Sequence, residues 1–440
     1  MSKIFKWAGV LSAAAVAMAL QGASPAASAP VGVFDSGLGG LTVLERLLDV
    51  DMFNNSTGKP GADGVPDFAA ESFQYLGDQA NMPYGDYAAE GKSDYLKELI
   101  WKDAQFLLGE KFFRDRNEAV PTGAKPRAKI IVIACNTATA WGLSLVRERL
   151  AAQGDGTKVV GVIEAGVRAT LDGLGAGPTS EPFAIGVLAT PGTISSGAYE
   201  RTLRAELAAR GVKAEVPVIG QGCPGLADAV EACCPAADAI AAANMKALAE
   251  RHAASCSKAP IRAVILGCTH FPFVQKALER TVAELRANGA NFAADFRFVD
   301  PAIYTAAECY AILRDGGLLA PRGKRPAPLR AFLSVADPTL PKDRLTADGQ
   351  LVRSYKYGRD VSDPDTHTKP VPFTRANFGD DVFAGVGRLL PKTAALLDAR
   401  RAARSPLRRQ RRIPSGIQPA SQKGAAPRTS SPRPTPDAGR

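Results

Sequence analysis

The chain has 440 residues, of which 46% are hydrophobic, so it is long and apolar enough for two domains with sizeable cores. Its formal net charge is +10, but residues 400–440 alone contain ten arginines, one lysine and one aspartate and carry all of that excess. The rest of the chain is neutral overall, which argues against a basic globular surface that binds nucleic acid.

The amino-terminal segment has the pattern of a secretory signal peptide. Lys3 and Lys6 precede an apolar stretch, 7–20, that is too short to span a bilayer as an ordinary helix. An A-x-A pattern follows at 27–29. We therefore expect 1–29 to be a signal peptide and the mature protein to be exported to the periplasm. If the segment is instead an uncleaved extension or reflects a wrongly assigned start codon, the protein is cytoplasmic.

Strands and helices alternate from residue 31 onward. A first lobe is expected over 30–163, with strands at 31–34, 73–76, 129–134 and 159–164, helices at 41–50, 95–113 and 138–150, and a surface insertion at 51–70. A second lobe is expected over 164–295, with strands at 183–188, 215–219 and 261–267 and helices at 199–210, 225–253 and 274–288. This alternation predicts an α/β fold of two similar, doubly wound parallel-sheet lobes with a cleft between them.

Residues 296–400 are expected to return to the first lobe and to extend it. Segment 296–300 and a helix at 302–313 lead back, 331–336 is an edge strand, 338–372 is loop-like, and 382–397 is a terminal helix. Residues 401–440 are rich in Pro, Ser, Ala and Arg and predict a disordered basic tail. Such a tail could contact an anionic surface, but it has no aromatic side chains that would stack on bases.

Two apolar runs rich in β-branched residues each end in a cysteine. The run 129–134 leads into Cys135, and the run 261–267 leads into Cys268. Ligands bind at the carboxyl ends of the strands in open α/β sheets. Two such half-sites facing each other would place one thiol on each side of a bound molecule, which is what inversion of a stereocentre requires. The Gly-rich turn at 35–40 offers backbone N–H groups to an anion.

The other five cysteines follow neither a metal-ligand spacing nor a disulfide framework, and the total of seven leaves at least one thiol free. Cys233 and Cys234 are adjacent. We expect this pair to be partly buried within a helix rather than to form a redox device.

Five motifs in register resemble those of glutamate racemases, a branch of the aspartate/glutamate racemase superfamily. They are VGVFDSGLGGLT from residue 31, YLGD and PYG between 75 and 85, ACNTA at 134–138, TPGT at 190–193 and GCTHFP at 267–272. The match runs in order from about residue 31 to about residue 313. The resemblance implies racemisation of L- and D-glutamate, which supplies D-glutamate for peptidoglycan. It also implies a small-molecule substrate and no cofactor, neither pyridoxal phosphate nor a metal, and it leaves a homodimer open.

The resemblance further implies that Cys135 and Cys268 remove and return the α-proton from opposite faces. Thiolate chemistry suits this step, because a thiolate is an effective base whose protonation is readily adjusted by its neighbours. Asp35 and His270 are the implied partners that adjust it, and Glu231 matches a further carboxylate of the family. The resemblance also implies a set of substrate-binding residues, whose hydroxyl, amide and backbone groups suit the two carboxylates of glutamate. They are Asp35, Ser36, Tyr84, Gly85, Asn136, Thr137, Thr269 and His270.

The same residues also have simpler interpretations. A cysteine after an apolar strand is often a small buried hydrophobe, Asp35 could cap a helix, His270 could be a satisfied core histidine, and Glu231 could be a solvated helix residue. Three other functions therefore stay open. The protein could be an exported racemase of another amino acid such as aspartate, a zinc protein with cysteine, histidine and aspartate ligands, or an amino-acid-binding protein without turnover.

Overall fold

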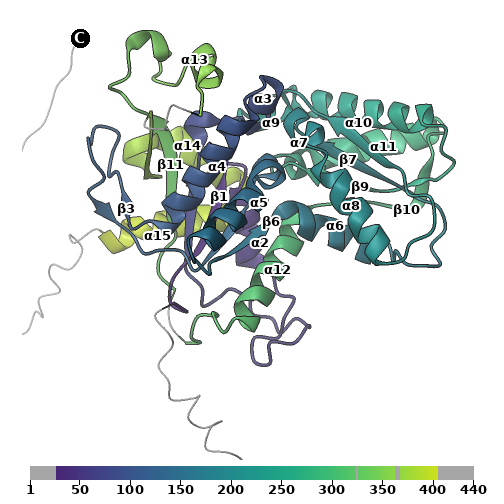
Figure 1. The fold of residues 1–440 in the computed structure, drawn as a ribbon, viewed down its shortest axis with the longest axis horizontal. Helices are drawn as coiled ribbons and strands as arrows, with labels where there is room; N and C mark the ends of the chain where they lie inside the picture. The colour runs from purple at the N-terminus through teal and green to yellow at the C-terminus, as the bar shows by residue number, and fades with distance from the viewer. Residues whose placement is uncertain (1–25, 324–325, 362–366, 405–440) are drawn as a thin grey trace, which may run out of the picture.

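The computed structural model describes residues 26–323, 326–361 and 367–404, which form two large sheets, each covered by helices on both faces (Figure 1). The parallel sheets confirm the predicted α/β class. Most of the predicted signal peptide, 1–29, and most of the predicted basic tail, 401–440, lie outside the described residues. Among the residues that are described, no helix has the length and apolar character needed to cross a membrane.

The first sheet has six strands in the order β12-β11-β2-β1-β5-β6, and all its neighbours pair in parallel except β12, which is antiparallel to β11. Its central strands are buried on both faces and are accordingly continuous apolar runs. The strands are β1 (Val31–Asp35), β2 (Phe73–Gly77), β5 (Ile130–Ile133), β6 (Lys158–Gly161), β11 (Arg330–Ala336) and β12 (Thr368–Pro372).

Two apolar cores cover the two faces of this sheet. On one face lie α2 (Leu41–Asp49), α12 (Pro301–Asp315), α14 (Arg375–Leu389) and α15 (Pro391–Arg404). On the other face lie α3 (Tyr84–Ala89), α4 (Ser93–Leu108), α5 (Asn136–Ala152) and the short α13 (Arg353–Gly358). Smaller elements of this part of the chain are η1 (Gln79–Asn81), η3 (Lys342–Arg344) and the paired β3 (Lys111–Phe112) and β4 (Gly123–Ala124).

The second sheet has four parallel strands in the order β10-β9-β7-β8. They are β7 (Ala184–Ala189), β8 (Val218–Gly222), β9 (Ile261–Gly267) and β10 (Phe292–Val299). One face packs on α9 (Leu226–Glu231), α10 (Ala237–Ala254), η2 (Phe271–Val274) and α11 (Gln275–Ala287). The other face packs on α6 (Val162–Gly173) and α8 (Ala198–Ala209), and α7 (Pro191–Ser195) follows β7.

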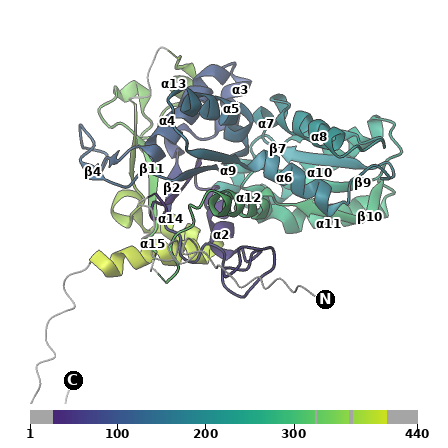
Figure 2. The same ribbon diagram turned by 60° about the horizontal axis from the view of Figure 1, so that its bottom comes forward.

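Helices join the two sheets into one body. Helix α12 packs against both α2 and α6, and Figure 2 shows it between the two groups of elements. Helix α7, after the second sheet's β7, packs against α3 and α5 of the first. The carboxyl ends of β1, β5 and β9 therefore lie near one another, and this is where the two cysteines are found.

The structure differs from the sequence expectations in several places. The strand expected at 159–164 ends at residue 161, and α6, a helix that was not expected, begins at residue 162 and crosses the lobe boundary expected after 163. The helix expected at 95–113 ends at residue 108, and the strand expected at 215–219 lies at 218–222.

The boundary expected after residue 295 falls inside β10, whose residues 297–299 pair with β9. The helix expected at 225–253 is two helices, because the chain turns at 232–236, a segment that contains Pro235. The terminal helix expected at 382–397 is likewise two helices, α14 and α15, with Pro391 opening the second.

A further difference concerns 338–372, which was expected to be loop-like but contains α13 and β12. Strand β12 includes Pro370 and Pro372, and prolines are typical of loops. They are tolerated here because β12 is an edge strand whose alternate N–H positions face outward. The N–H of Phe373 donates to Ala331 of β11, so positions 370 and 372 face away from β11 and no ladder bond is lost. Strand β11, expected at the edge, is therefore interior.

Candidate active site

Cys135 and Cys268 line the same cavity, one from each sheet. Cys135 follows β5 as the N-cap of α5, and Cys268 follows β9 directly. Their exposed fractions are 6% and 7%. The cavity between them has a volume of about 20 Å³, room for about one water, so the cleft is closed in this structure. Its lining also contains these residues of the predicted site: Ser36, Tyr84, Gly85, Asn136, Thr137, Thr269 and His270.

The surroundings of Cys135 keep its thiol protonated. Its Sγ accepts a hydrogen bond from the N–H of Ala138 at 3.4 Å, and the thiol lies 3.7 Å from Ser36 Oγ, to which it donates. Burial, and after it the nearby Asp35 carboxylate, raises the pKa of Cys135 to about 12. Cys135 therefore carries its proton near neutral pH.

Asp35 is fully buried at the end of β1, beside the cavity. Its carboxylate accepts hydrogen bonds from the N–H of Gly37 at 2.9 Å and from Thr269 Oγ1 at 3.4 Å. Burial raises the pKa of Asp35 to about 6, with the charge of His270 opposing the rise. Asp35 thus links the turn after β1 to the motif after β9, across the two sheets.

Cys268 has a different partner. His270 Nδ1 lies 3.6 Å from Cys268 Sγ, and His270 Nε2 lies 2.6 Å from Glu231 Oε2. Burial by itself would lower the pKa of His270, but the hydrogen bonds to Cys268 and Glu231 outweigh it and raise that pKa well above its usual value. A charged imidazolium then donates to both neighbours, the sulfur of Cys268 and the carboxylate of Glu231.

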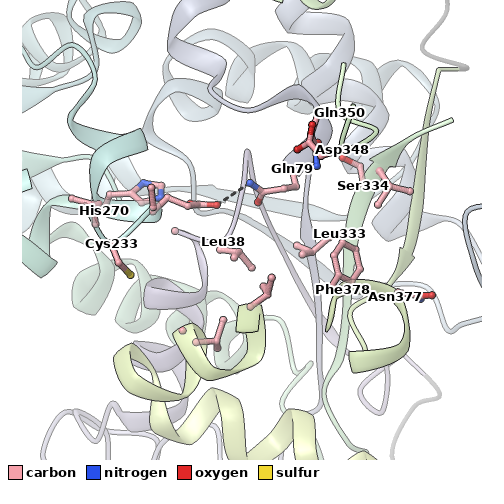
Figure 3. A pocket seen from close by; sticks show the side chains of 18 of the residues that line it. Leu38, Gln79, Cys233, His270, Leu333, Ser334, Asp348, Gln350, Asn377 and Phe378 are labelled. Atoms are coloured by element: carbon pink, nitrogen blue, oxygen red, sulfur yellow. Dashed lines mark hydrogen bonds and ion pairs between the residues drawn. The ribbon is translucent and has the colours of Figure 1, made fainter. Parts of the chain in front are cut away.

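Glu231 is held from the other lobe as well. Gln79 Nε2, on η1, donates to Glu231 Oε1 at 2.9 Å (Figure 3). Burial would raise the pKa of Glu231, but the hydrogen bond and charge of His270 lower it, so the carboxylate stays ionised. Cys268, His270 and Glu231 therefore form a thiol–imidazole–carboxylate chain that ends on Gln79.

Polar groups for a ligand come from the starts of α5 and α7. Asn136 Oδ1 accepts from the Tyr199 hydroxyl at 2.6 Å, so the amide offers its Nδ2 donor to a ligand. Thr137 Oγ1 lies 3.0 Å from the hydroxyls of both Thr190 and Thr193. These hydroxyls and the adjoining helix N-termini suit a carboxylate.

Tyr84 lines the cavity, as the other predicted substrate-binding residues in its lining do, but its hydroxyl points elsewhere. That hydroxyl lies 2.6 Å from Asp78 Oδ2 and from Asp103 Oδ2, in the buried interior. Burial and these two carboxylates raise the pKa of Tyr84 well above its usual value. The hydroxyl of Tyr84 is therefore not available to a ligand, and the other atoms of Tyr84 form part of the cavity wall.

Sequence reasoning missed the polar groups that support the site from a distance. Thr190 and Thr193 belong to the TPGT motif and could have been included on that ground. Gln79 and Tyr199 have no local sequence signal, because each acts across the cleft on a residue far along the chain.

Glycines let the lobes meet closely at the cavity. A Cβ at Gly39 would lie 2.4 Å from His270 Cε1, and one at Gly192 would lie 2.5 Å from the carbonyl oxygen of Gly85. The first contact joins the turn after β1 to His270, and the second joins α7 to α3. Both positions therefore need a residue without a side chain.

As for metal binding, no group of three or more His, Cys, Asp or Glu side chains with ligand-like placement occurs in 26–323, 326–361 or 367–404.

Comparison with known proteins agrees with the motifs. Residues 117–309 match the family model of Asp/Glu/Hydantoin racemase. Glutamate racemase from Levilactobacillus brevis is 30% identical over 293 residues, which cover 66% of this chain and 80% of the relative. Glutamate racemase from Pseudomonas paraeruginosa is 32% identical over 303 residues, covering 69% of this chain and 88% of the relative. Among solved structures, glutamate racemase isoform RacE1 from Bacillus anthracis has 27% identity and a TM-score of 0.48 and covers 69% of this chain and 88% of that chain. This chain belongs to the glutamate racemase family.

Proposed function

We propose that this protein interconverts L- and D-glutamate without a cofactor, using Cys135 and Cys268 as two bases on opposite faces of the α-carbon. One observation carries the proposal: two buried thiols, delivered by β5 and β9 of different sheets, line one closed cavity. The relatives at 30% and 32% identity are glutamate racemases, which supports glutamate as the substrate.

The two thiols have different neighbours, which suits a two-base reaction. In one direction of the reaction Cys268, whose Sγ lies 3.6 Å from His270 Nδ1, removes the α-proton, and Cys135, whose pKa is raised, donates a proton from the other face. After one turnover the protonation states are exchanged, and the enantiomer is then converted by the reverse sequence. Asp35 and His270 adjust the two thiols, and Glu231 keeps His270 charged.

The remaining cavity residues bind and orient the substrate. Glutamate has two carboxylates, which are matched by the Asn136 amide and by hydroxyls such as those of Ser36 and Thr137. A cavity of about 20 Å³ is too small for this molecule, so the two lobes must part for glutamate to enter and must close again around it. Closure also removes water, which strengthens the electrostatic interactions that stabilise the carbanion.

In the cell we propose that the product D-glutamate supplies peptidoglycan, in line with the glutamate racemase family. The signal-peptide pattern at the amino terminus supports the alternative, export. Peptidoglycan precursors are assembled in the cytoplasm, so an exported protein would instead act on free amino acids outside the cytoplasmic membrane.

The test follows D-glutamate in D2O under reducing conditions, with the purified full chain. We expect deuterium to appear at the α-carbon while the circular dichroism of the substrate decays to zero. Cys135→Ser and Cys268→Ser should each stop the decay. If the thiols are shown to be free and no exchange occurs at high enzyme concentration, glutamate is the wrong substrate. The same assay with aspartate then tests the second candidate function.

A further inference from the structure

Cys233 and Cys234 are exposed in the turn between α9 and α10, contrary to the expectation that they are partly buried within a helix. Cys233 has a φ of 51°, in the left-handed region that favours glycine. Both are free thiols in this structure. Two adjacent, accessible thiols at a strained backbone position have no role in the racemisation described above.

The turn that holds this pair also ends α9. The N–H of Cys233 donates to the carbonyl of Val230 at 3.0 Å, and the N–H of Cys234 donates to the carbonyl of Ala229 at 2.8 Å. These two bonds form the capping pattern that closes a helix with one left-handed residue. Glu231, the last residue of α9, lies within this capped turn, so its position depends on the backbone of the two cysteines.

The pair is also close to the reactive part of the site. Cys233, Glu231 and His270 all line a second, larger cavity of about 620 Å³, and Figure 3 shows Cys233 and His270 at the same end of it. Glu231 is bonded to His270 at 2.6 Å, and His270 contacts Cys268. A change in the backbone at 233–234 therefore reaches the sulfur of Cys268 through two contacts.

We propose that Cys233 and Cys234 form a reversible vicinal disulfide that lowers activity by moving Glu231 away from His270. The proposal rests on the function proposed above. The oxidant is a small organic disulfide such as oxidised glutathione. One cysteine thiolate attacks it and releases one glutathione thiolate, and the second cysteine then attacks the mixed disulfide and releases the other. The protein loses two protons and two electrons, and the glutathione disulfide is reduced to two thiols.

Ring closure must change the turn. Adjacent Cα atoms are about 3.8 Å apart, whereas the Cα atoms of ordinary disulfides are about 4.4–6.8 Å apart. The backbone torsions at 233–234 must therefore adjust to close the small ring, and the two capping hydrogen bonds of α9 depend on these torsions. Glu231 moves with the end of the helix and loses its contact with His270.

Accessibility decides which thiols react first. Cys233 and Cys234 are exposed, whereas Cys135 and Cys268 are buried in a cavity too small for glutathione. Cys256 is also exposed and has a positive φ of 58°, but it lies at the end of α10, outside the cavities lined by His270, and has no adjacent cysteine. It provides a matched control.

The experiment treats the full chain with oxidised glutathione and makes three measurements. Mass spectrometry should show that the peptide containing both cysteines loses the mass of two hydrogen atoms. The racemase kcat should fall about a hundredfold, within the usual contribution of a positioned acid or base, and dithiothreitol should restore it. NMR of ¹⁵N-histidine-labelled protein should show a shift of the His270 ring signals, while those of His252 and His367 stay in place.

Two variants decide between explanations. Cys234→Ser should stay active and keep its His270 signals in oxidised glutathione, and Cys256→Ser should respond like the unaltered chain. Inactivation that persists in Cys234→Ser would place the oxidation elsewhere and overturn the proposal, as would a 233–234 disulfide that leaves the His270 signals unchanged. If the reduced protein shows no racemase activity, the proposed function fails, and the His270 signals still decide whether the disulfide reaches the site.

Discussion

A single methyl group at Gly39 should disable the site by displacing His270. The Cβ of Gly39→Ala would lie 2.4 Å from His270 Cε1, 2.7 Å from His270 Nδ1 and 2.6 Å from Thr269 Oγ1. Ordinary contacts to a Cβ begin at 3.4 Å, so the imidazole must move by about 1 Å. His270 is held 2.6 Å from Glu231 and 3.6 Å from Cys268, and a shift of this size loosens both contacts.

A misplacement of about 1 Å in a catalytic constellation costs about a hundredfold in rate, which corresponds to about 2.7 kcal/mol of barrier. We therefore expect kcat of Gly39→Ala to fall about a hundredfold, measured by the decay of circular dichroism with D-glutamate. Overpacking should also lower the free energy of unfolding by about 1–3 kcal/mol, measured in urea. Gly156→Ala is the control, because a Cβ there meets nothing within 4 Å. A folded Gly39→Ala enzyme with unchanged kcat would refute the argument that the lobes meet at this glycine.

Two further predictions concern charged groups. In Glu231→Gln the carboxylate that helps to raise the pKa of His270 is lost, so the imidazolium loses its proton at lower pH. The alkaline limb of the pH profile of kcat should therefore move to lower pH. The control is Asp238→Asn, an exposed residue on α10, which should leave that limb in place. An unmoved limb in Glu231→Gln would contradict the pairing of Glu231 with His270. Separately, a chain that begins at residue 30 should be less stable than one that begins at residue 26, because the buried ammonium of Lys129 loses its hydrogen bond to the Ala27 carbonyl, 2.9 Å long. We expect the free energy of unfolding to fall by about 1.5–3 kcal/mol, the usual contribution of a hydrogen bond to a charged group. Equal stability of the two chains would show that another contact replaces the bond between Lys129 and Ala27.

Local sequence patterns were sufficient for the central strands and the two cysteines. Buried parallel strands need continuous runs of β-branched residues, and such runs lead directly into Cys135 and Cys268. Patterns failed where a residue's role depends on distant neighbours. The prolines of β12 are typical of a loop, and only the pairing with β11 makes this segment a strand. The sequence likewise does not show that the hydroxyl of Tyr84 is bonded to Asp78 and Asp103 in the interior.

The sequence by itself determined the two-sheet architecture, the strand ends that present the thiols, and the motifs that identify the family, because each depends on residues close together along the chain. Only the tertiary structure decided how the two thiols differ. The charge of His270 depends on Glu231, 39 residues away on α9, and Glu231 is held by Gln79, 152 residues away on η1. A proton's position depends on burial and on charges within a few ångströms, and those distances exist only after the two lobes have folded against each other.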